Sequence, residues 1–500
     1  MKNLFNSIQL MKPKKNVFDL SHDVKLSAKM GNLVPVMVQE CVPGDKFKIG
    51  CESLIRFAPL VAPVMHRMDV SMHYFFVPNR ILWDNWEKFI TDANTTHVMP
   101  FINYTPQGTE NAFTKFADYL GVPPNLSGAA RQINAFPFAA YQAIYNEYYR
   151  DQNLIAEVDY KLVDGTNNSN SDLFVMRKRA WEHDYFTASL PFAQKGAAVD
   201  IPLGTVSGEG EVFVNNASAG TTLDGTPYDI GVDNNTASIP GVGADQLFTS
   251  FDNVEVEPTT INDLRRAFRL QEWLEKNARG GTRYIENILT HFGVKSSDKR
   301  LQRPEYITGI KTPVVISEIL NTTGADGGLP QGNMSGHGIA VSTGKYGQYF
   351  CEEHGYIIGI MSVMPKTAYQ QGIPRTYLKS DPLDFYWPSF ANIGEQEVKN
   401  DEIFAYTITG NDTFGYVPRY AEYKFNPSRV AGDFRTTLDF WHLGRKFATL
   451  PTLSQEFIEC TPEDVERIFA VQDDTDNLYC HVYHKITAVR PMPKFGTPMF

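Results

Sequence analysis

Short runs of apolar and β-branched residues, separated by turn residues, recur along the whole chain. Runs of this length are typical of strands, and they do not alternate with helices at the spacing of βαβ units. The connections between them are far longer than hairpins, which favours a two-sheet antiparallel sandwich of jelly-roll type. Strands are predicted in residues 34–40, 62–78, 312–320, 355–365, 402–408, 434–441 and 477–491.

Helical spacing of apolar residues is limited to a few segments. A helix is predicted over residues 262–278, where Gly280 and Gly281 end it. A second follows over 285–292 and ends at Gly293. Capping residues predict further short helices after Asn79, after Pro137 at a first helical turn, and after Thr461. The sequence therefore predicts a mainly β protein with long loop insertions and a few short helices.

The chain shows no signal for a membrane span or for export. Its longest apolar stretch, residues 356–364, is about half of the roughly 20 residues that a membrane helix needs, and the first residues lack the apolar core of a signal peptide. The cysteines are few, odd in number and widely spaced, without a C-x-x-C pair, so we expect reduced, buried packing residues. They are Cys41, Cys51, Cys351, Cys460 and Cys480.

Charge is distributed unevenly along the chain, whose 57 acidic and 46 basic residues give a net charge of −11. Residues 196–257 contain ten acids and no Lys or Arg, which predicts a solvated, β-rich insertion. Residues 264–303 then hold ten Lys or Arg against four acids, a balance of +6. The first thirty residues carry six lysines against two acids, a balance of +4. Positive charge that is concentrated in two segments favours a protein with one surface that binds a polyanion and another surface that faces away from it.

These shifts of charge and pattern predict five segments. Residues 1–30 form a basic N-terminal arm, and 31–195 form the first part of the jelly roll with helical insertions. Residues 196–258 are the acidic, surface-exposed insertion and 259–303 a basic two-helix segment. Residues 304–500 complete the jelly roll.

Motifs of catalysis and cofactor binding are missing from the sequence. No P-loop, dinucleotide fingerprint, H-E-x-x-H or G-x-S-x-G is present, so we expect no enzyme, cofactor or metal. His481 and His484 are three apart on a strand and should point to opposite faces, which argues against shared metal ligation. Asp473, Asp474 and Asp476 lack the spacing of a calcium loop. The tryptophans Trp83, Trp86, Trp273 and Trp441 lie in apolar patterns and are predicted to pack in the core.

Several blocks resemble one family, the major capsid proteins of the microviruses, which are small icosahedral single-stranded DNA bacteriophages, and especially their gokushovirus branch. The most specific block is ARGGTRY, at residues 278–284. The resembling blocks follow the family's order and span most of the chain, whereas residues 155–257 match in character only. These blocks are residues 72–90, 145–154, 264–306, 381–398 and 415–445.

The resemblance implies an eight-stranded viral jelly roll, with sixty copies closing a T=1 icosahedral shell around circular single-stranded DNA. It also implies a virion location after assembly in the bacterial cytoplasm, and no enzymatic activity. Its implied partners are further copies of the chain, a small basic DNA-binding virion protein, a minor pilot protein, a scaffolding protein and a host surface receptor. In gokushoviruses a long insertion protrudes at the threefold axes; residues 196–258 would correspond to it, although they are short for a tall protrusion.

Charge and resemblance together give two sets of candidate residues. The first set would line the interior and bind DNA independently of sequence: Lys12, Lys14, Lys15, Arg283, Lys299, Arg300 and Arg303. A competing role for its last four members is to form salt bridges between subunits. The second set would face the host from the acidic loop: Glu209, Glu211, Asp224, Asp229 and Asp233. Phe385, Trp387, Pro388 and Trp441 are predicted packing or interface residues without a ligand.

Two other classes of function remain open. A β-sandwich polysaccharide hydrolase could use paired carboxylates such as Glu352 and Glu353, but neighbours on a strand would point to opposite faces and could not flank one bond. A glycan-binding adhesin could use the Gly-rich insertion. Of these readings only the capsid protein predicts a closed megadalton shell.

Overall fold

The computed structural model describes residues 14–92, 94–104, 112–124, 131–197, 199–200, 260–322, 331–406, 412–472 and 475–495, and the short strands between residues 206 and 256. The chain divides into two compact units. The larger unit comprises Met1–Ala193 and Asn277–Phe500, and the smaller comprises Gln194–Lys276. The fold is mainly β and antiparallel, as the pattern predicts.

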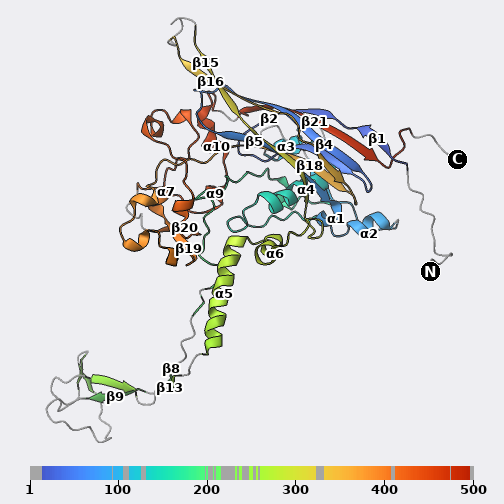
Figure 1. Ribbon diagram of the computed structural model, residues 1–500. Coiled ribbons are helices and arrows are strands. Elements are labelled where there is room, and N and C mark those ends of the chain that lie inside the picture. The colour runs from blue at the N-terminus through green and yellow to red at the C-terminus, as the bar shows by residue number, and fades with distance from the viewer. Residues whose placement is uncertain are drawn as a thin grey trace. The chain divides into compact units, whose positions relative to one another are not determined.

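Two antiparallel sheets form the body of the larger unit (Figure 1). The seven-stranded sheet has the order β1-β21-β4-β16-β15, with β2 beside β21 and β17 beside β4. Its strands are β1 (Asn16–Asp19), β2 (His22–Ala28), β4 (Lys46–Phe57), β15 (Val315–Leu320), β16 (Met334–Ser342), β17 (Gly347–Phe350) and β21 (Leu478–Arg490). The four-stranded sheet has the order β14-β5-β18-β3. Its strands are β3 (Val34–Cys41), β5 (Met68–Pro78), β14 (Glu305–Pro313) and β18 (Gly355–Pro365).

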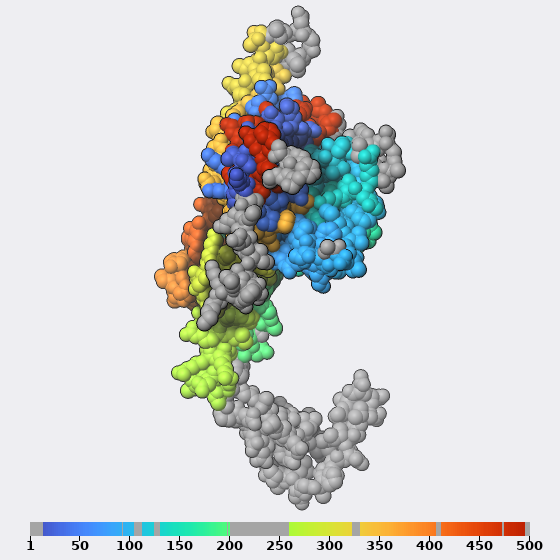
Figure 2. Space-filling view, turned by 90° about the vertical axis from the view of Figure 1, so that its right-hand side faces the viewer, coloured from blue at the N-terminus to red at the C-terminus, as the bar shows by residue number. Residues whose placement is uncertain are grey.

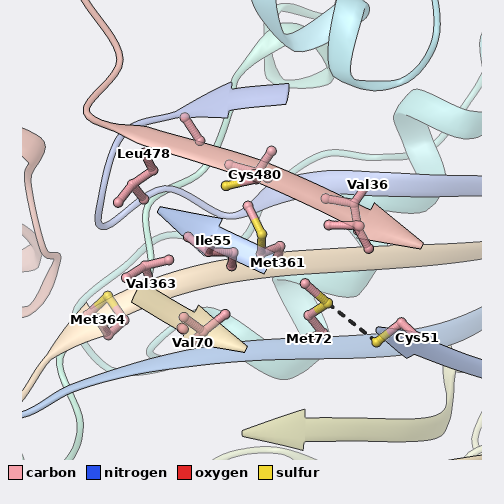
Figure 3. Packing of buried hydrophobic residues seen from close by; sticks show 14 of the residues in the cluster. Val36, Cys51, Ile55, Val70, Met72, Met361, Val363, Met364, Leu478 and Cys480 are labelled. Carbon is pink, nitrogen blue, oxygen red and sulfur yellow. Dashed lines mark hydrogen bonds between the residues drawn. The ribbon is translucent and has the colours of Figure 1, made fainter. Parts of the chain in front are cut away.

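The main core lies between the inner faces of these two sheets. Ile55 and Cys480 from one sheet pack in the same cluster as Val36 and Met361 from the other (Figure 3). Side chains of β21 alternate between buried and accessible because only one face of that strand meets the core. All five cysteines are free and buried, which confirms their predicted packing role.

A helical layer covers the outer face of the four-stranded sheet. Phe75 and Ile358 point into a second cluster, which also contains Trp83 and Tyr141. Every residue of β18 is buried because both faces of this sheet are covered. The layer contains α1 (Asn79–Leu82), α2 (Trp86–Thr91), α3 (Ala112–Tyr119), α4 (Phe136–Ile144), the π-helical turn η2 (Tyr145–Tyr149), η3 (Ser171–Phe174), β6 (Phe101–Tyr104) and β7 (Arg131–Asn134).

A third apolar cluster lies among the loops of the C-terminal half, around Tyr369, Phe414 and Phe457. The regular elements of this half are β19 (Glu395–Lys399), β20 (Thr413–Pro418), α7 (Asn400–Ile403), α8 (Ala421–Lys424), α9 (Gln455–Ile458) and α10 (Pro462–Val465). Single turns of 3₁₀-helix separate them: η4 (Arg375–Tyr377), η5 (Pro382–Asp384), η6 (Pro388–Phe390), η7 (Gly432–Arg435), η8 (Asp439–Trp441) and η9 (Glu466–Ile468).

The smaller unit contains most of helix α5 (Ile261–Gly280) and three pairs of short strands. The pairs are β8 (Val206–Ser207) with β13 (Glu255–Val256), β9 (Gly210–Val214) with β12 (Leu247–Phe251), and β10 (Gly231–Asp233) with β11 (Thr236–Ser238). Helix α6 (Tyr284–Phe292) belongs to the larger unit and ends at Gly293, whose φ of 68° is left-handed. Both predicted helices, 262–278 and 285–292, are confirmed.

Three local predictions are wrong. A strand was expected over residues 402–408, of which the structure describes 402–406. There α7 ends only at Ile403, because the Glu402 carboxylate accepts the backbone N–H of Lys399 and caps a helical turn. Residues 434–441 form the turns η7 and η8 instead of a strand, since the Asp433 carbonyl accepts backbone N–H groups from Thr436 and Leu438. Trp273 was expected in the core but is 51% exposed. Trp83 is 1% exposed, as predicted.

Among the described residues no helix is both long and apolar enough to cross a membrane.

Candidate nucleic-acid interface

Arg283 stands at the start of α6 against the π-helical turn. Its guanidinium donates to the backbone carbonyls of Asn146 and Arg150 at 2.5 and 3.2 Å. Carboxylate oxygens of Glu147 and Glu286 lie 3.7 and 3.6 Å from it. Burial lowers the pKa of Arg283, while these carboxylates act in the opposite direction. The charge of Arg283 is therefore compensated within its own chain.

Arg303 shares the acidic partner Glu147 with Arg283. Its Nε lies 3.5 Å from Glu147 and 3.6 Å from Asp298, and its side chain is 10% exposed. The guanidinium also stacks over the ring of Tyr148 with its carbon 4.8 Å from the ring centroid. Arg283 and Arg303 both line a pocket of about 660 Å³, which also includes Glu147 and Arg150. The structure thus brings these two candidates together around one carboxylate.

The other basic candidates are more accessible. Lys299 forms an ion pair with Glu352 at 2.7 Å, whereas Arg300 is exposed and has no ion pair with a described residue. Lys14 is exposed, and the Nζ of Lys15 donates to the Gly44 carbonyl at 2.8 Å. Lys12 lies outside the described residues.

The acidic candidates fall in the smaller unit. Glu211 and Asp233 belong to β9 and β10, two strands for which the structure describes the backbone alone. Glu209, Asp224 and Asp229 lie outside the described residues.

The carboxylates considered for hydrolysis do not share a site. Glu352 and Glu353 lie in the bend between β17 and β18, which corrects their expected place on a strand. Glu352 pairs with Lys299, and Glu353 makes a two-point contact with Arg80, at 3.0 Å to Nε and 3.1 Å to Nη2. Each carboxylate is held by a different cation, so nothing in this geometry favours joint acid and base catalysis.

The outer face of the seven-stranded sheet carries cations that the sequence analysis did not select. Lys46, Lys48 and Arg56 alternate with buried residues along β4 and are exposed. Lys25 of β2 is also exposed, and its neighbour across the sheet is His481 of β21. No described residue forms an ion pair with any of these four. The alternation in KFKIGCESLIRF, residues 46–57, was the signal that would have predicted this face.

An aromatic patch is exposed on the 3₁₀ segments that follow β18. Phe385 and Trp387 are 53% and 48% exposed, so they are not core residues. Tyr386 contacts the ring of Tyr423, and the Lys379 ammonium lies 5.4 Å from the ring centroid of Phe385. Exposed rings gathered in this way are typical of surfaces that pack against another protein.

The comparisons with known proteins agree on one family. Residues 6–500 match the family described as "Capsid protein (F protein)". The chain is 35% identical to "Capsid protein VP1" of Chlamydia phage 1 over an alignment of 589 residues, covering 100% of this chain and 98% of that one. It is 35% identical to "Capsid protein VP1" of Bdellovibrio phage phiMH2K, covering 99% and 97% of the two chains. Identity to "Capsid protein VP1" of Spiroplasma virus 4 is 32%, covering 96% and 94%.

Proposed function

Because the chain belongs to the capsid protein (F protein) family, we propose that sixty copies of it close a T=1 icosahedral shell around circular single-stranded DNA. A structural capsid role follows from full-length similarity to named capsid proteins, and with it self-assembly and a place in the virion. The names of the family and of the similar proteins indicate a structural role. The proposal also includes a small basic DNA-binding protein, a pilot protein and a scaffolding protein as partners.

The pairing of eight strands supports a jelly roll within this shell. The strands β2, β21, β4 and β16 are neighbours in one sheet, and β3, β18, β5 and β14 are neighbours in the other. Consecutive strands of this set lie in opposite sheets, except β5 and β14, which are paired neighbours joined by a long connection, as in a Greek-key sandwich. The helical layer and the third apolar cluster are then insertions between these strands.

The exposed aromatic patch is the observation that supports self-assembly at the level of single residues. Rings of this size contribute most of the contact energy in protein interfaces when they are covered. Leaving them in water is unfavourable, by roughly 25 cal/mol for each Å² of apolar surface. We infer that a neighbouring subunit covers the patch formed by Phe385, Tyr386, Trp387 and Tyr423.

Replacing two rings of this patch tests the assembly surface. The double variant Phe385→Ser, Trp387→Ser should sediment mainly as small species, whereas the unaltered chain should form a particle in the megadalton range. Tyr284→Ser is the matched control, because Tyr284 of α6 is 70% exposed and lies outside the patch. Shells formed normally by the double variant would contradict the proposed interface. An unaltered chain that never forms shells would contradict the proposed function itself.

The N-terminal lysines are proposed to reach packaged DNA. Lys14 is exposed, and its neighbour Lys15 lies at the edge of the seven-stranded sheet beside Gly44. Particles of the Lys14→Glu, Lys15→Glu variant should contain less DNA, since two phosphate contacts become repulsive. The amount of nuclease-protected DNA per particle measures this effect. An unchanged DNA content would contradict the proposed role of the N-terminal lysines in binding DNA. Arg283, Lys299, Arg300 and Arg303 stay in the proposed interior set, with Arg300 the least engaged by its own chain.

Residues 196–258 are proposed to face outward and to contact a host receptor, because an acidic segment is repelled by DNA phosphates. The segment from 196 to 257 has no Lys or Arg, so trypsin has no target there, whereas a glutamate-specific protease can cut after Glu209, Glu211 and Glu255. Intact particles should be cleaved in this segment by the second enzyme. Full protection of the segment in particles, with cleavage in the dissociated subunit, would contradict an outward position.

A further inference from the structure

We propose that the outer face of the seven-stranded sheet, here called the open face, is a platform for single-stranded nucleic acid. Phosphates would lie against its cations and bases against its aromatic rings. This inference rests on the proposed function, because it places nucleic acid inside the shell. It deepens that function by naming a surface that is separate from residues 283–303.

The open face has an excess of positive charge that its own chain does not compensate. Lys25, Lys46, Lys48 and Arg56 are exposed, and none of them forms an ion pair with a described residue. Two acids of the face are engaged: Asp23 with His481 at 2.7 Å, and Glu52 with Lys485. A third, Asp19, accepts hydrogen bonds from Ser21. The chain as a whole carries −11, so this local surplus runs against the overall charge.

Aromatic rings alternate with these cations across the strands. Tyr479 of β21, 52% exposed, is the direct neighbour of Arg56. Phe350 of β17, 49% exposed, is the direct neighbour of Lys46. Tyr346 stands just before β17 with the Lys48 ammonium 4.7 Å from its ring centroid. Bases stack on exposed rings of this kind irrespective of sequence, and lysines beside them hold the phosphates.

Strand geometry gives the face a regular spacing. Residues that share a face recur every second position, about 7 Å apart along a strand, so Lys46 and Lys48 point outward in succession. Figure 2 shows β21, in red, at the molecular surface beside blue N-terminal segments. A flexible single strand can follow such a surface, whereas a folded acidic protein would need a matching shape. These features favour nucleic acid as the occupant.

The contrast with Arg283 and Arg303 strengthens this assignment. A phosphate approaching either arginine must displace Glu147, Asp298 or a backbone carbonyl that already accepts a hydrogen bond. A phosphate approaching Lys48 or Arg56 has no carboxylate of a described residue to displace. Counterion release should therefore contribute more to the affinity for nucleic acid on the open face than at Arg283 and Arg303.

Ultraviolet cross-linking within intact particles tests the location directly. Mass spectrometry of digested particles should find nucleotide adducts on peptides that contain Tyr479 or Tyr483 and on residues 345–350. Adducts confined to residues 283–303 or to residues 1–15 would overturn the inference. So would cross-links from the open face to another protein in place of DNA. Neither result would affect the proposed shell, which depends on sedimentation of the particle.

A charge-matched pair of variants tests the energetic role. The triple variant Lys25→Gln, Lys48→Gln, Arg56→Gln should reduce nuclease-protected DNA per particle to about half or less, because three phosphate contacts are lost. The control Arg265→Gln, Arg266→Gln, Lys295→Gln removes three exposed cations from the basic segment and should leave the content unchanged. Equal loss in both variants, or loss in the control alone, would overturn the inference.

Removing rings without changing charge provides a test that does not depend on the charge variants. Tyr346→Ser, Tyr479→Ser particles should assemble normally, because the inference places both rings against nucleic acid and not against a neighbouring subunit, and neither ring belongs to the core. Their DNA should become more accessible to nuclease after mild opening of the shell, since stacking contributes about 1–3 kcal/mol per base. Unchanged protection in particles of normal mass would contradict the stacking part of the inference.

Discussion

The two sheets differ in what lies on their outer faces. The four-stranded sheet is covered by a helical layer, and cations near that layer, such as Arg283 and Arg303, contact carboxylates of their own chain. No described helix covers the outer face of the seven-stranded sheet, and Lys48 and Arg56 there have no described acidic partner. A dense run of cations in the sequence therefore does not identify the cations that are available to a ligand. A cation is available when no covering layer supplies carboxylates that pair with it.

The largest expected effect comes from removing a charge in the covered layer. Arg303→Met leaves Glu147 and Asp298 without this partner and removes the stack on Tyr148. The variant should cost about 3 kcal/mol, the low end of the range for breaking a buried ion pair, because Asp298 loses this ion pair while Arg283 still lies beside Glu147. Urea unfolding of the dissociated subunit measures the free energy of unfolding.

The matched change on the open face is Lys485→Met, which breaks the pair with Glu52. Water can replace this contact, so the free energy of unfolding should not change measurably. If the two variants destabilise the subunit equally, the covered and open faces do not differ in the way described here. If Arg303→Met has no effect, its contacts are not structural and a role at DNA or at a neighbouring subunit gains support.

The sequence pattern correctly predicted the strands in which each face has one environment along its whole length, either buried or accessible. The continuous apolar run of β18 and the alternation of β21 follow directly from burial on two faces and on one face. Residues 434–441 were predicted wrongly because apolar and β-branched residues also occur in turns held by local backbone bonds, as at Asp433. The charge of residues 264–303 was visible in the sequence, but the pairing of Arg303 with Glu147 was not, since the two are far apart along the chain.

The two faces of β21 predict a second difference, in response to pH. The ring of His484 is 0% exposed: its Nε2 donates to the Val36 carbonyl at 3.0 Å, and its Nδ1 accepts from the Tyr74 hydroxyl at 2.9 Å. Burial, with a smaller contribution from His22, lowers the pKa of His484 to about 4 from 6.5. The folded chain therefore binds fewer protons than the unfolded chain between these values.

Stability should fall as the pH drops from 6.5 to 4, by about 3 kcal/mol for His484, because each pKa unit corresponds to about 1.4 kcal/mol. Above pH 6.5 the residue should contribute no pH dependence. His484→Gln should flatten the measured slope in this window, whereas Thr487→Ser, on the exposed face of the same strand, removes no titratable group and should leave it unchanged. An equal flattening by both variants would mean that loss of the His484 imidazole is not the cause.

The smallest of these effects concerns a glycine in each sheet. A Cβ added at Gly359 of β18 would come within 2.8 Å of the Tyr74 ring and 3.0 Å of the Met37 Cβ, both inside the core. Gly359→Ala should therefore cost about 2 kcal/mol, the range for overpacking. At Gly50 of β4 the Cβ would meet the Tyr346 ring at 2.7 Å, but Tyr346 is 47% exposed and can swing into solvent. Gly50→Ala should then cost less than about 1 kcal/mol, because only an exposed ring moves. Equal destabilisation of the subunit in urea would show that Tyr346 is held as firmly as the core, and that the open face is more rigid than its exposure indicates.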